Sequence, residues 1–435
     1  MLLKIRAALA AALTLALLSG CGDENANKGE VRIVNATTEY ASLDLYTQNS
    51  DGGNDLVVGG TAAGAVSAYT GVDKGSYTFN VKSASGASNA ASAAGTVNKT
   101  DHYTVVTYLT GNASKAEFLS DEETHPASGN AKVRVFNAAS SEAPSVDVYL
   151  SKNVCTALAV TDTAFATAIT GLQSSYSQVT SSSAGDDWNV CVFATGDTET
   201  LLLDIPKLTL KDQEIATLIL THTAGGVLLN AAVLDQQGAL TAYANTIARV
   251  RVVADAAASG SVSVTLNGVD QASEAASPSV GDYKTIAVGS ISATVTIGSG
   301  TASGFTLPAP VAGNDYTLLV TGDASNPAAT LITDNNTPST STTNTVKARV
   351  INGLNGGNGS VSGTVDGKTV GSAAFQAASG YTTILPTTGT STVRGITTGT
   401  NPTDLVNQSY AAGSVYTIFI YGDASAPKMD SIVDR

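Results

Sequence analysis

The sequence predicts an all-β protein built from tandem β-sandwich domains. Three observations lead to this prediction: a short arginine-centred segment recurs four times, short runs alternate apolar with polar residues, and helical periodicity is scarce. Alternation with a period of two places one face of a strand in a core and the other in solvent. Many such strands, separated by Gly, Asn, Asp and Ser, are typical of a β-sandwich.

The first element is an export signal. Lys4 and Arg6 precede the apolar stretch AALAAALTLALL, which is too short to span a bilayer comfortably. The string LLSGC then ends at Cys21 and resembles the bacterial lipobox, in which a signal peptidase cleaves before a cysteine that carries lipid. We expect a lipoprotein signal peptide over 1–20 and a lipidated cysteine with a flexible tether over 21–29. In the alternative, the signal is an ordinary secretory one and the cysteine is incidental.

The residue after the cysteine bears on location. It is Gly22 and not aspartate, and by resemblance to proteobacterial lipoproteins this favours the outer membrane. Each buried methylene contributes about 0.8 kcal/mol, so several acyl chains are needed for a stable hold. The expected location is the outer membrane, with the domains facing the periplasm or the cell surface.

Composition narrows the classes of partner. Removal of Lys4 and Arg6 with the signal leaves 20 Lys and Arg against 36 Asp and Glu, a net charge of −16. This charge argues against nucleic acid and against anionic lipid headgroups as partners. Only 13% of the residues are charged, a composition that suits exported β domains better than a cytosolic enzyme.

The repeats are visible as internal similarity. Four segments align on one arginine each, and an alternating strand follows about ten residues later. The segments are EVRIVNA, AKVRVFNAAS, ARVRVVADA and KARVINGL, with Arg32, Arg134, Arg251 and Arg349. The arginines are 102, 117 and 98 residues apart, close to the size of one independent domain.

The predicted domains are immunoglobulin-like β-sandwiches joined like beads by polar linkers. The clearest linker is TDNNTPSTSTTNT, at 333–345, which lacks apolar periodicity. The predicted bounds are 30–124 for repeat 1, 131–238 for repeat 2, 247–336 for repeat 3 and 346–435 for repeat 4.

A second recurring segment predicts a late core strand. YTVVTYLTGNAS, YTLLVTGDAS and YTIFIYGDAS begin at Tyr103, Tyr316 and Tyr416. In repeat 2, IATLILTHTAGG takes their place. Continuous apolar runs are typical of central strands covered on both faces. We expect the glycine in each, Gly111, Gly322 or Gly422, to take a positive φ in the turn that follows.

The repeated polar residues allow two interpretations. Alternation in VRVF places Arg134 outward, where it would pair across strands with Asp147, as Arg32 would with Asp44. A row of arginines that binds a ligand is the alternative. The repeated tyrosines, Tyr69, Tyr176, Tyr283 and Tyr381, are expected to be packing residues with a satisfied hydroxyl.

The segment AKVRVFNAASSEAPSVDVYLS, at 131–151, resembles the opening of the bacterial domain of unknown function DUF4397. Its members begin with a valine-arginine-valine strand, a loop with proline and a valine-aspartate-valine-tyrosine strand. Repeats 3 and 4 depart from this pattern, with Ser263 and Ser362 in place of the aspartate. The resemblance implies tandem sandwich-like domains in exported or envelope proteins, and it supplies no catalytic residues.

Two cysteines indicate a disulfide. Cys155 and Cys191 lie 36 residues apart in repeat 2, in a chain that the signal sends to an oxidising compartment. A bond closing this loop would contribute about 4 kcal/mol on the chain-entropy model. Two buried free thiols are the alternative. Trp188, three residues before Cys191, is expected to be a core residue that packs near the bridge.

Candidates for catalysis and metal binding are few. The three histidines are His102, His125 and His222, and no HExxH, CxxC or GxSxG motif accompanies them. NSDGGND, at 49–55, suggests a calcium loop, but an EF-hand counted from Asp51 would place Ala62 at its twelfth position. We therefore predict no catalytic, cofactor-binding or metal-binding residues.

The sequence favours a non-enzymatic envelope lipoprotein, a tandem β-domain stalk or an adhesion or interaction module. Its expected partners are the membrane, through the lipid, and an envelope or extracellular protein or glycan. A carbohydrate-binding protein that captures glycans is the alternative. A hydrolase is the third possibility, and it requires a pocket where His102 or His222 pairs with a serine or carboxylate.

Overall fold

The computed structural model describes most of the chain after the signal and tether. The described residues are 27–37, 40–48, 52–83, 89–110, 113–158, 162–173, 175–223, 225–256, 260–338, 345–356, 359–386, 389–397 and 402–435. Cys21 and Gly111 therefore lie outside them. The described part is almost entirely β structure, with one 3-10 turn, η1 (Cys155–Ala157). This confirms the predicted all-β fold of tandem sandwiches.

Repeat 1 contains two four-stranded sheets, with orders β4-β1-β7-β8 and β3-β2-β5-β6. Its strands are β1 (Lys28–Asn35), β2 (Ser42–Gln48), β3 (Asn54–Ala62), β4 (Thr70–Asp73), β5 (Gly75–Ser83), β6 (Asn89–Val97), β7 (His102–Thr110) and β8 (Ala113–Ser120). The arginine segment forms β1 and the later apolar run forms β7, and these two strands pair in parallel.

Repeat 2 has the same arrangement with one added edge strand. Its sheets have the orders β12-β9-β15-β16-β17 and β11-β10-β13-β14. The strands are β9 (Asn130–Asn137), β10 (Val146–Ser151), β11 (Ala166–Ile169), β12 (Ser177–Thr180), β13 (Asp186–Ala194), β14 (Leu201–Leu210), β15 (Ile215–His222), β16 (Leu229–Asp235) and β17 (Leu240–Tyr243). IATLILTH forms β15, parallel to β9, and thus replaces the tyrosine segment as predicted.

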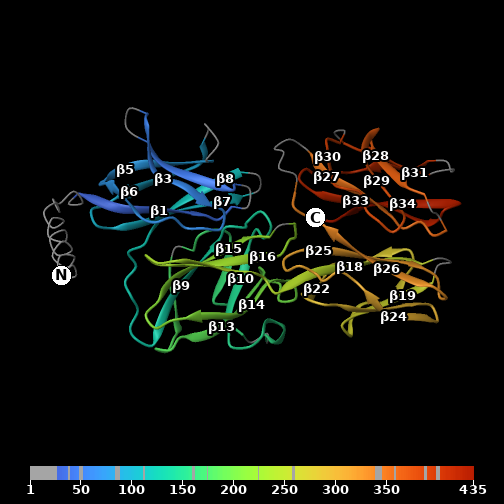
Figure 1. Ribbon diagram of the computed structural model, residues 1–435, viewed down its shortest axis with the longest axis horizontal. Helices are drawn as coiled ribbons and strands as arrows, with labels where there is room; N and C mark the ends of the chain where they lie inside the picture. The colour runs from blue at the N-terminus through green and yellow to red at the C-terminus, as the bar shows by residue number, and fades with distance from the viewer. Residues whose placement is uncertain are drawn as a thin grey trace, which may run out of the picture. The chain divides into compact units, whose positions relative to one another are not determined.

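Repeat 3 splits the fourth strand into two short pieces, β21 and β22, which both pair with β18. Its sheets have the orders β21-β18-β25-β26 and β20-β19-β23-β24. The strands are β18 (Ile247–Ala256), β19 (Ser261–Leu266), β20 (Val269–Ala276), β21 (Ser279–Val280), β22 (Lys284–Ala287), β23 (Ser292–Ile297), β24 (Gly300–Thr306), β25 (Asp315–Gly322) and β26 (Pro327–Asp334). In Figure 1 the layer with β18, β25 and β26 lies over the layer with β19 and β24.

Repeat 4 returns to eight strands, with sheet orders β30-β27-β33-β34 and β29-β28-β31-β32. The strands are β27 (Val346–Asn352), β28 (Val361–Val365), β29 (Lys368–Ala373), β30 (Thr382–Ile384), β31 (Ser391–Thr397), β32 (Thr403–Gln408), β33 (Val415–Asp423) and β34 (Ala426–Val433). One strand order thus recurs four times, with the arginine strand and the late apolar strand side by side at the centre of one sheet.

Each pair of sheets encloses its own apolar core. In repeat 3, for example, the buried side chains of Val250, Val252, Val264 and Leu318 meet between the sheets. Strands such as β25 and β33 are buried along almost their whole length, as the continuous apolar runs predict. Gly322 and Gly422 follow these runs with φ of 91° and 87°, which confirms the predicted left-handed turn positions for both.

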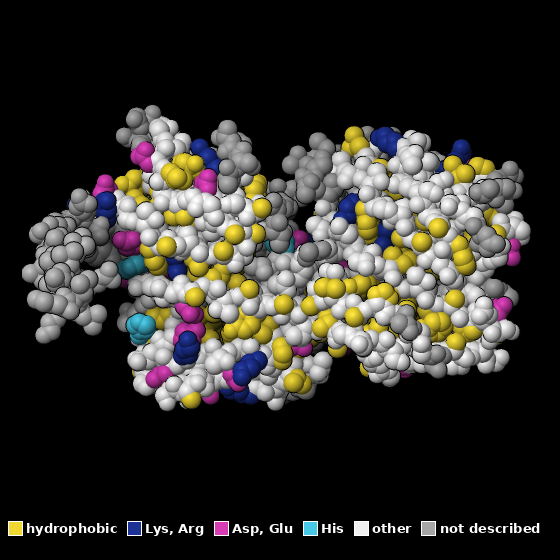
Figure 2. All heavy atoms as spheres, in the orientation of Figure 1, with side chains coloured by type: hydrophobic (Ala, Val, Ile, Leu, Met, Phe, Trp, Pro, Cys, Tyr) yellow, Lys and Arg dark blue, Asp and Glu magenta, His cyan; other side chains and the backbone are white. Residues whose placement is uncertain are grey.

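The described residues form two compact units. One holds most of repeat 1, and the other holds repeats 2, 3 and 4 together with 108–114 of repeat 1. Within the described residues we find no helix long and apolar enough to cross a membrane. The face drawn in Figure 2 carries few charged side chains, in keeping with the low charged fraction of the sequence.

Candidate functional site

The repeated arginines are buried, and the prediction that they point outward to an acid on the next strand is wrong. Arg32, Arg134, Arg251 and Arg349 are each at most 6% exposed. Asp44 and Asp147 lie in the other sheet of their sandwich and accept hydrogen bonds from backbone amides instead. A strand in the middle of a sheet is covered on both faces, so alternation does not tell which polar side chain meets solvent.

Each arginine contacts the same two residue types. Its Nε donates to a threonine hydroxyl on the parallel neighbouring strand at 2.8 to 3.0 Å. Its guanidinium also lies 4.5 to 4.9 Å from the centroid of the repeated tyrosine ring, a cation–π distance. The sets are Arg32, Thr104 and Tyr69; Arg134, Thr217 and Tyr176; Arg251, Thr317 and Tyr283; Arg349, Thr417 and Tyr381.

In three repeats an aspartate completes this arginine cluster. The acid stands 17 residues after the threonine and accepts a hydrogen bond from its hydroxyl, as Asp121, Asp334 and Asp434 do. In repeat 1, Arg32 Nη2 lies 3.6 Å from Asp121 of the same repeat. The cluster therefore joins the centre of the sheet to its last strand.

Repeats 3 and 4 exchange their acids. Arg349 of repeat 4 contacts Asp334 of repeat 3, with 2.5 Å between Nη2 and Oδ1. Arg251 of repeat 3 contacts Asp434 of repeat 4, with 2.6 Å between Nη2 and Oδ1. Burial raises the pKa of Asp434, although both arginines act in the opposite direction. The two reciprocal pairs therefore lie between the two domains, away from water.

An apolar cluster surrounds these ion pairs. Val253 and Leu319 of repeat 3 pack with Ile351, Phe419 and Tyr421 of repeat 4. The outer face of each central sheet is thus covered by the other repeat. The sequence predicts that repeats 3 and 4 are separate beads joined by a linker. In the structure they are instead two sandwiches packed against each other.

One acid in this interface has no ion pair with any residue that the structure describes. The carboxylate of Asp255, which is 1% exposed, accepts a hydrogen bond from the backbone amide of Gly422 at 3.2 Å, and its backbone carbonyl accepts one from the side-chain amide of Asn355 at 2.7 Å. Burial raises the pKa of Asp255 to about 7, and the Gly422 hydrogen bond offsets only part of this effect. The interface therefore contains a carboxyl that titrates near neutral pH.

Repeat 2 keeps the arginine and loses the acid. Gln236 occupies the position that the aspartate has in the other repeats. This equivalence follows from the backbone, since the backbone N–H of Gln236 donates to the carbonyl of Ile215 as that of Asp121 donates to the carbonyl of His102. Arg134 Nη2 is buried and has no hydrogen-bond partner in the part of the chain that the structure describes. Repeat 2 is stabilised in a different way, through its cysteines.

Cys155 and Cys191 form a disulfide, with Cα atoms 5.4 Å apart, as the sequence predicts. The bridge lies in a buried apolar cluster with Phe193, Leu201 and Leu228. Trp188 instead packs against the central core of repeat 2, so its predicted place near the bridge is wrong. An odd separation along a strand puts two side chains on opposite faces.

Two of the histidines pair with glutamates. His102 Nδ1 lies 2.8 Å from Glu122 at a partly exposed site, and His222 Nδ1 contacts Glu142 in a buried one. Arg435, the last residue, contacts the same Glu142 at 3.7 Å. Burial acts to raise the pKa of Glu142, but the hydrogen bond and charge of His222 outweigh it and hold this pKa below its usual value.

In a hydrolase built on His222, the ring nitrogen that does not contact Glu142 would have to accept a proton from a nucleophile such as a serine hydroxyl. His222 Nε2 is buried with no hydrogen-bond partner among the described residues, and the His222 side chain is 7% exposed. The His222–Glu142 contact is therefore a buried contact within repeat 2, and Arg435 joins the C-terminal strand region to it through Glu142.

The metal candidates do not converge. Within the described ranges, no three His, Cys, Asp or Glu side chains are grouped so that they could hold a metal ion. Asn49 to Asp51 of the suggested calcium loop lie outside those ranges. Asp55, at the other end of the loop, lines a cavity of about 240 Å³ in repeat 1.

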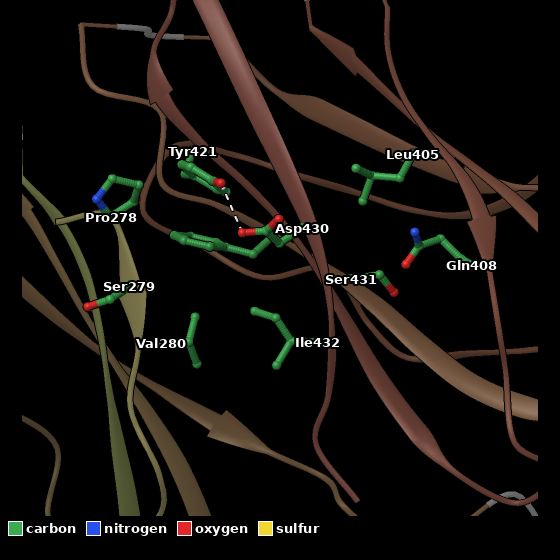
Figure 3. A pocket seen from close by; sticks show the side chains of 10 residues that line it. Pro278, Ser279, Val280, Leu405, Gln408, Tyr421, Asp430, Ser431 and Ile432 are labelled. Carbon is green, nitrogen blue, oxygen red and sulfur yellow. Dashed lines mark hydrogen bonds between the residues drawn. The ribbon is translucent and has the colours of Figure 1, made fainter. Parts of the chain in front are cut away.

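A larger cavity, of about 390 Å³, opens where repeats 3 and 4 meet. Its walls come from β21 of repeat 3 and from β32, β33 and β34 of repeat 4. In Figure 3, Ser279 and Val280 lie on one side, Leu405 and Gln408 on the other, and Tyr421 between them. We call this cavity the seam groove.

Reasoning from the sequence missed the threonine and the aspartate of the arginine cluster. A signal was present, because Tyr-Thr recurs at 103, 316 and 416 and an aspartate follows each threonine after 17 residues. A spacing shared by three repeats indicates a contact made in each of them. The exchange of acids between repeats 3 and 4 has no such signal, since the sequence of each cluster is the same in either arrangement.

The family described as Domain of unknown function (DUF4397) matches residues 29–149 of this chain. The match begins in β1, covers repeat 1 and ends in β10 of repeat 2. It confirms the resemblance predicted from the arginine and aspartate strands. No curated protein sequence matches the chain.

Three solved structures are among those that match this chain. A candidate cell adhesion protein from Bacteroides uniformis is 10% identical over 49% of this chain and 99% of its own, with a TM-score of 0.19. Another, from Bacteroides ovatus, is 10% identical over 49% and 98%, with a TM-score of 0.20. The multi-modular glycogen-degrading pneumococcal virulence factor SpuA is 11% identical over 88% of this chain, with a TM-score of 0.18, and this chain spans 38% of its length. TM-scores this low carry no argument about function.

Proposed function

We propose that this protein is a non-enzymatic interaction module of the bacterial cell envelope, anchored in the outer membrane through lipid on Cys21. Its β-sandwiches present surfaces to an envelope or extracellular partner, and the lipid keeps them at the membrane. The lipobox-like string before Cys21 supports the anchor.

One observation carries the proposal. The polar residues that recur in every repeat are the ones expected to serve chemistry if the repeats shared an activity. They contact one another within each repeat or between repeats 3 and 4, and they line neither of the two cavities described above. What the repeats share is therefore the scaffold, and any binding specificity belongs to positions that differ between them.

The anchor is tested by metabolic labelling. Cells grown with an alkyne-bearing palmitate are expected to label the wild-type protein and to leave a Cys21→Ser variant unlabelled and released from the membrane fraction. A Cys191→Ser variant, which alters only the disulfide, should still be labelled. Equal labelling of Cys21→Ser and wild type would contradict the lipid anchor.

The orientation is tested with a protease that cannot cross the outer membrane. Cleavage on intact cells, with a periplasmic control protein spared, would make extracellular proteins and glycans the partners to pursue. Protection until the membrane is breached would instead point to a periplasmic scaffold and would exclude adhesion.

A further inference from the structure

We infer that the seam groove between repeats 3 and 4 binds a short neutral saccharide. The groove measures about 390 Å³, near the lower end of the range for small-ligand sites, roughly 300–1,000 Å³. This volume suits a ligand of one or two sugar rings. The inference deepens the proposed function, because it names a ligand class for the module.

The floor of the groove is aromatic. The rings of Phe419 and Tyr421 stack with centroids 5.0 Å apart and planes at 25°, and both residues line the groove together with Pro278. Phe419 and Tyr421 are only 1% and 8% exposed, so they support the groove from beneath. Pro278, Leu405 and Ile432 supply the apolar surface that a sugar's C–H groups can cover. Leu405 and Ile432 extend the apolar surface at the two sides.

The rim is polar and rich in groups that pair with hydroxyls. Asp430 accepts a hydrogen bond from Tyr421 Oη at 2.9 Å, as Figure 3 shows. Its exposed carboxylate retains further acceptor capacity. Gln408 offers an amide, while Ser279 and Ser431 offer hydroxyls from opposite sides. Carboxylate and amide groups can pair with two neighbouring hydroxyls at once.

The charges of the lining select against ionic ligands. None of the ten residues that line the groove is Lys, Arg or His, and Asp430 is the one carboxylate among them. A phosphate, a sulfate or an acidic sugar would meet a negative charge and no cation. A hydrocarbon ligand would leave the polar rim without partners. A neutral polyhydroxylated ligand satisfies both the floor and the rim.

The groove is held in shape by the contacts beneath it. Its two walls belong to different repeats, and the reciprocal pairs of Arg251 with Asp434 and Arg349 with Asp334 fix those repeats together. Because the walls of the groove are already held in place, ligand binding has a smaller entropy cost for ordering protein groups. The interface and the site therefore depend on the same four side chains.

The test uses the purified full-length mature chain and three neutral disaccharides: maltose, cellobiose and N,N′-diacetylchitobiose. Saturation-transfer NMR and calorimetric titration are expected to detect at least one of them. Ser279→Trp, which fills the groove, should abolish binding. Asp430→Ala should weaken it by about tenfold or more, as for loss of a hydrogen bond to a charged group. Asp423→Asn, an exposed acid on the β33–β34 turn, is the matched control and should bind as wild type does.

Circular dichroism melting of every variant separates lost binding from lost folding. Absence of binding by all three disaccharides would overturn the inference, as would unchanged binding in both Ser279→Trp and Asp430→Ala. Neither result bears on the lipid anchor, because the labelling of Cys21 and the protease experiment test the proposed function independently.

Discussion

Repeat 2 and the pair of repeats 3 and 4 use the same arginine in opposite ways. Arg349 reaches a carboxylate in the neighbouring domain at 2.5 Å, whereas Arg134 has Thr217 and Tyr176 but no ion pair among the described residues. Repeat 2 carries a disulfide within its own repeat, and repeats 3 and 4 contain no cysteine. A repeated domain can therefore be stabilised from within or by its neighbour, while its central strands keep one sequence pattern.

The largest effect is expected for Arg349→Met. The substitution leaves the carboxylate of Asp334 buried without its cation, which typically costs about 3–5 kcal/mol. Urea unfolding of the mature chain should show this loss in the transition that reports on repeats 3 and 4. The double variant Arg349→Met with Asp334→Leu should recover most of it, because the carboxylate that lost its cation is then absent, while the Arg251–Asp434 pair remains. A double variant as unstable as the single one would show that the pair is not the cause.

Loss of the disulfide should cost less and act locally. Cys155→Ser with Cys191→Ser frees a loop closed across 36 residues, and removal of such a bond typically costs about 2–4 kcal/mol. We expect the loss in repeat 2 and unchanged unfolding of repeats 3 and 4, as measured by limited proteolysis in urea. Equal losses of stability in repeats 2, 3 and 4 would contradict the account, in which the disulfide stabilises repeat 2 and the interdomain ion pairs stabilise repeats 3 and 4.

Asp255 predicts a pH dependence of the repeat 3–repeat 4 interface. Its pKa is about 7 in the folded protein and near 3.9 when unfolded, so the folded state binds the extra proton between these values. Stability should therefore fall as pH rises from about 4 to 7, by at most about 1.4 kcal/mol per pH unit from this group, and level off above that. Asp255→Asn should remove this slope and be the more stable protein at pH 8. Denaturant midpoints measured across this pH range test it, and an unchanged slope in the variant would contradict it.

The smallest effect is expected for Arg134→Met. This arginine leaves no carboxylate behind, and its Nη2 is already without a hydrogen-bond partner. We expect the free energy of unfolding to change by at most about 1 kcal/mol, in either direction. The variant loses the cation–π contact with Tyr176, but it also removes a buried N–H group that has no hydrogen-bond partner, and these two effects offset each other. Urea unfolding of repeat 2 measures it. A loss as large as that of Arg349→Met would erase the contrast between the two regions.

The sequence predicted the strands well because their signals are local. Continuous runs such as YTIFIY indicate a buried central strand, and Gly422 marks its turn. The arginine site could not be predicted for a physical reason: Arg134 alternates with core-facing valines as an exposed residue does, yet it is 6% exposed, and alternation does not record what covers the second face of a strand. The disulfide followed from cysteine count and compartment, while the seam groove depends on how two domains meet, which no local pattern records.

The most direct test of the interlocked repeats is hydrogen exchange with mass spectrometry on Arg349→Met. If the two sandwiches stabilise each other, exchange should speed up in β25 and β26 of repeat 3 as well as in β27 and β33 of repeat 4, while β13 and β15 of repeat 2 keep their wild-type rates. Faster exchange confined to repeat 4, with repeat 3 unchanged, would contradict the account.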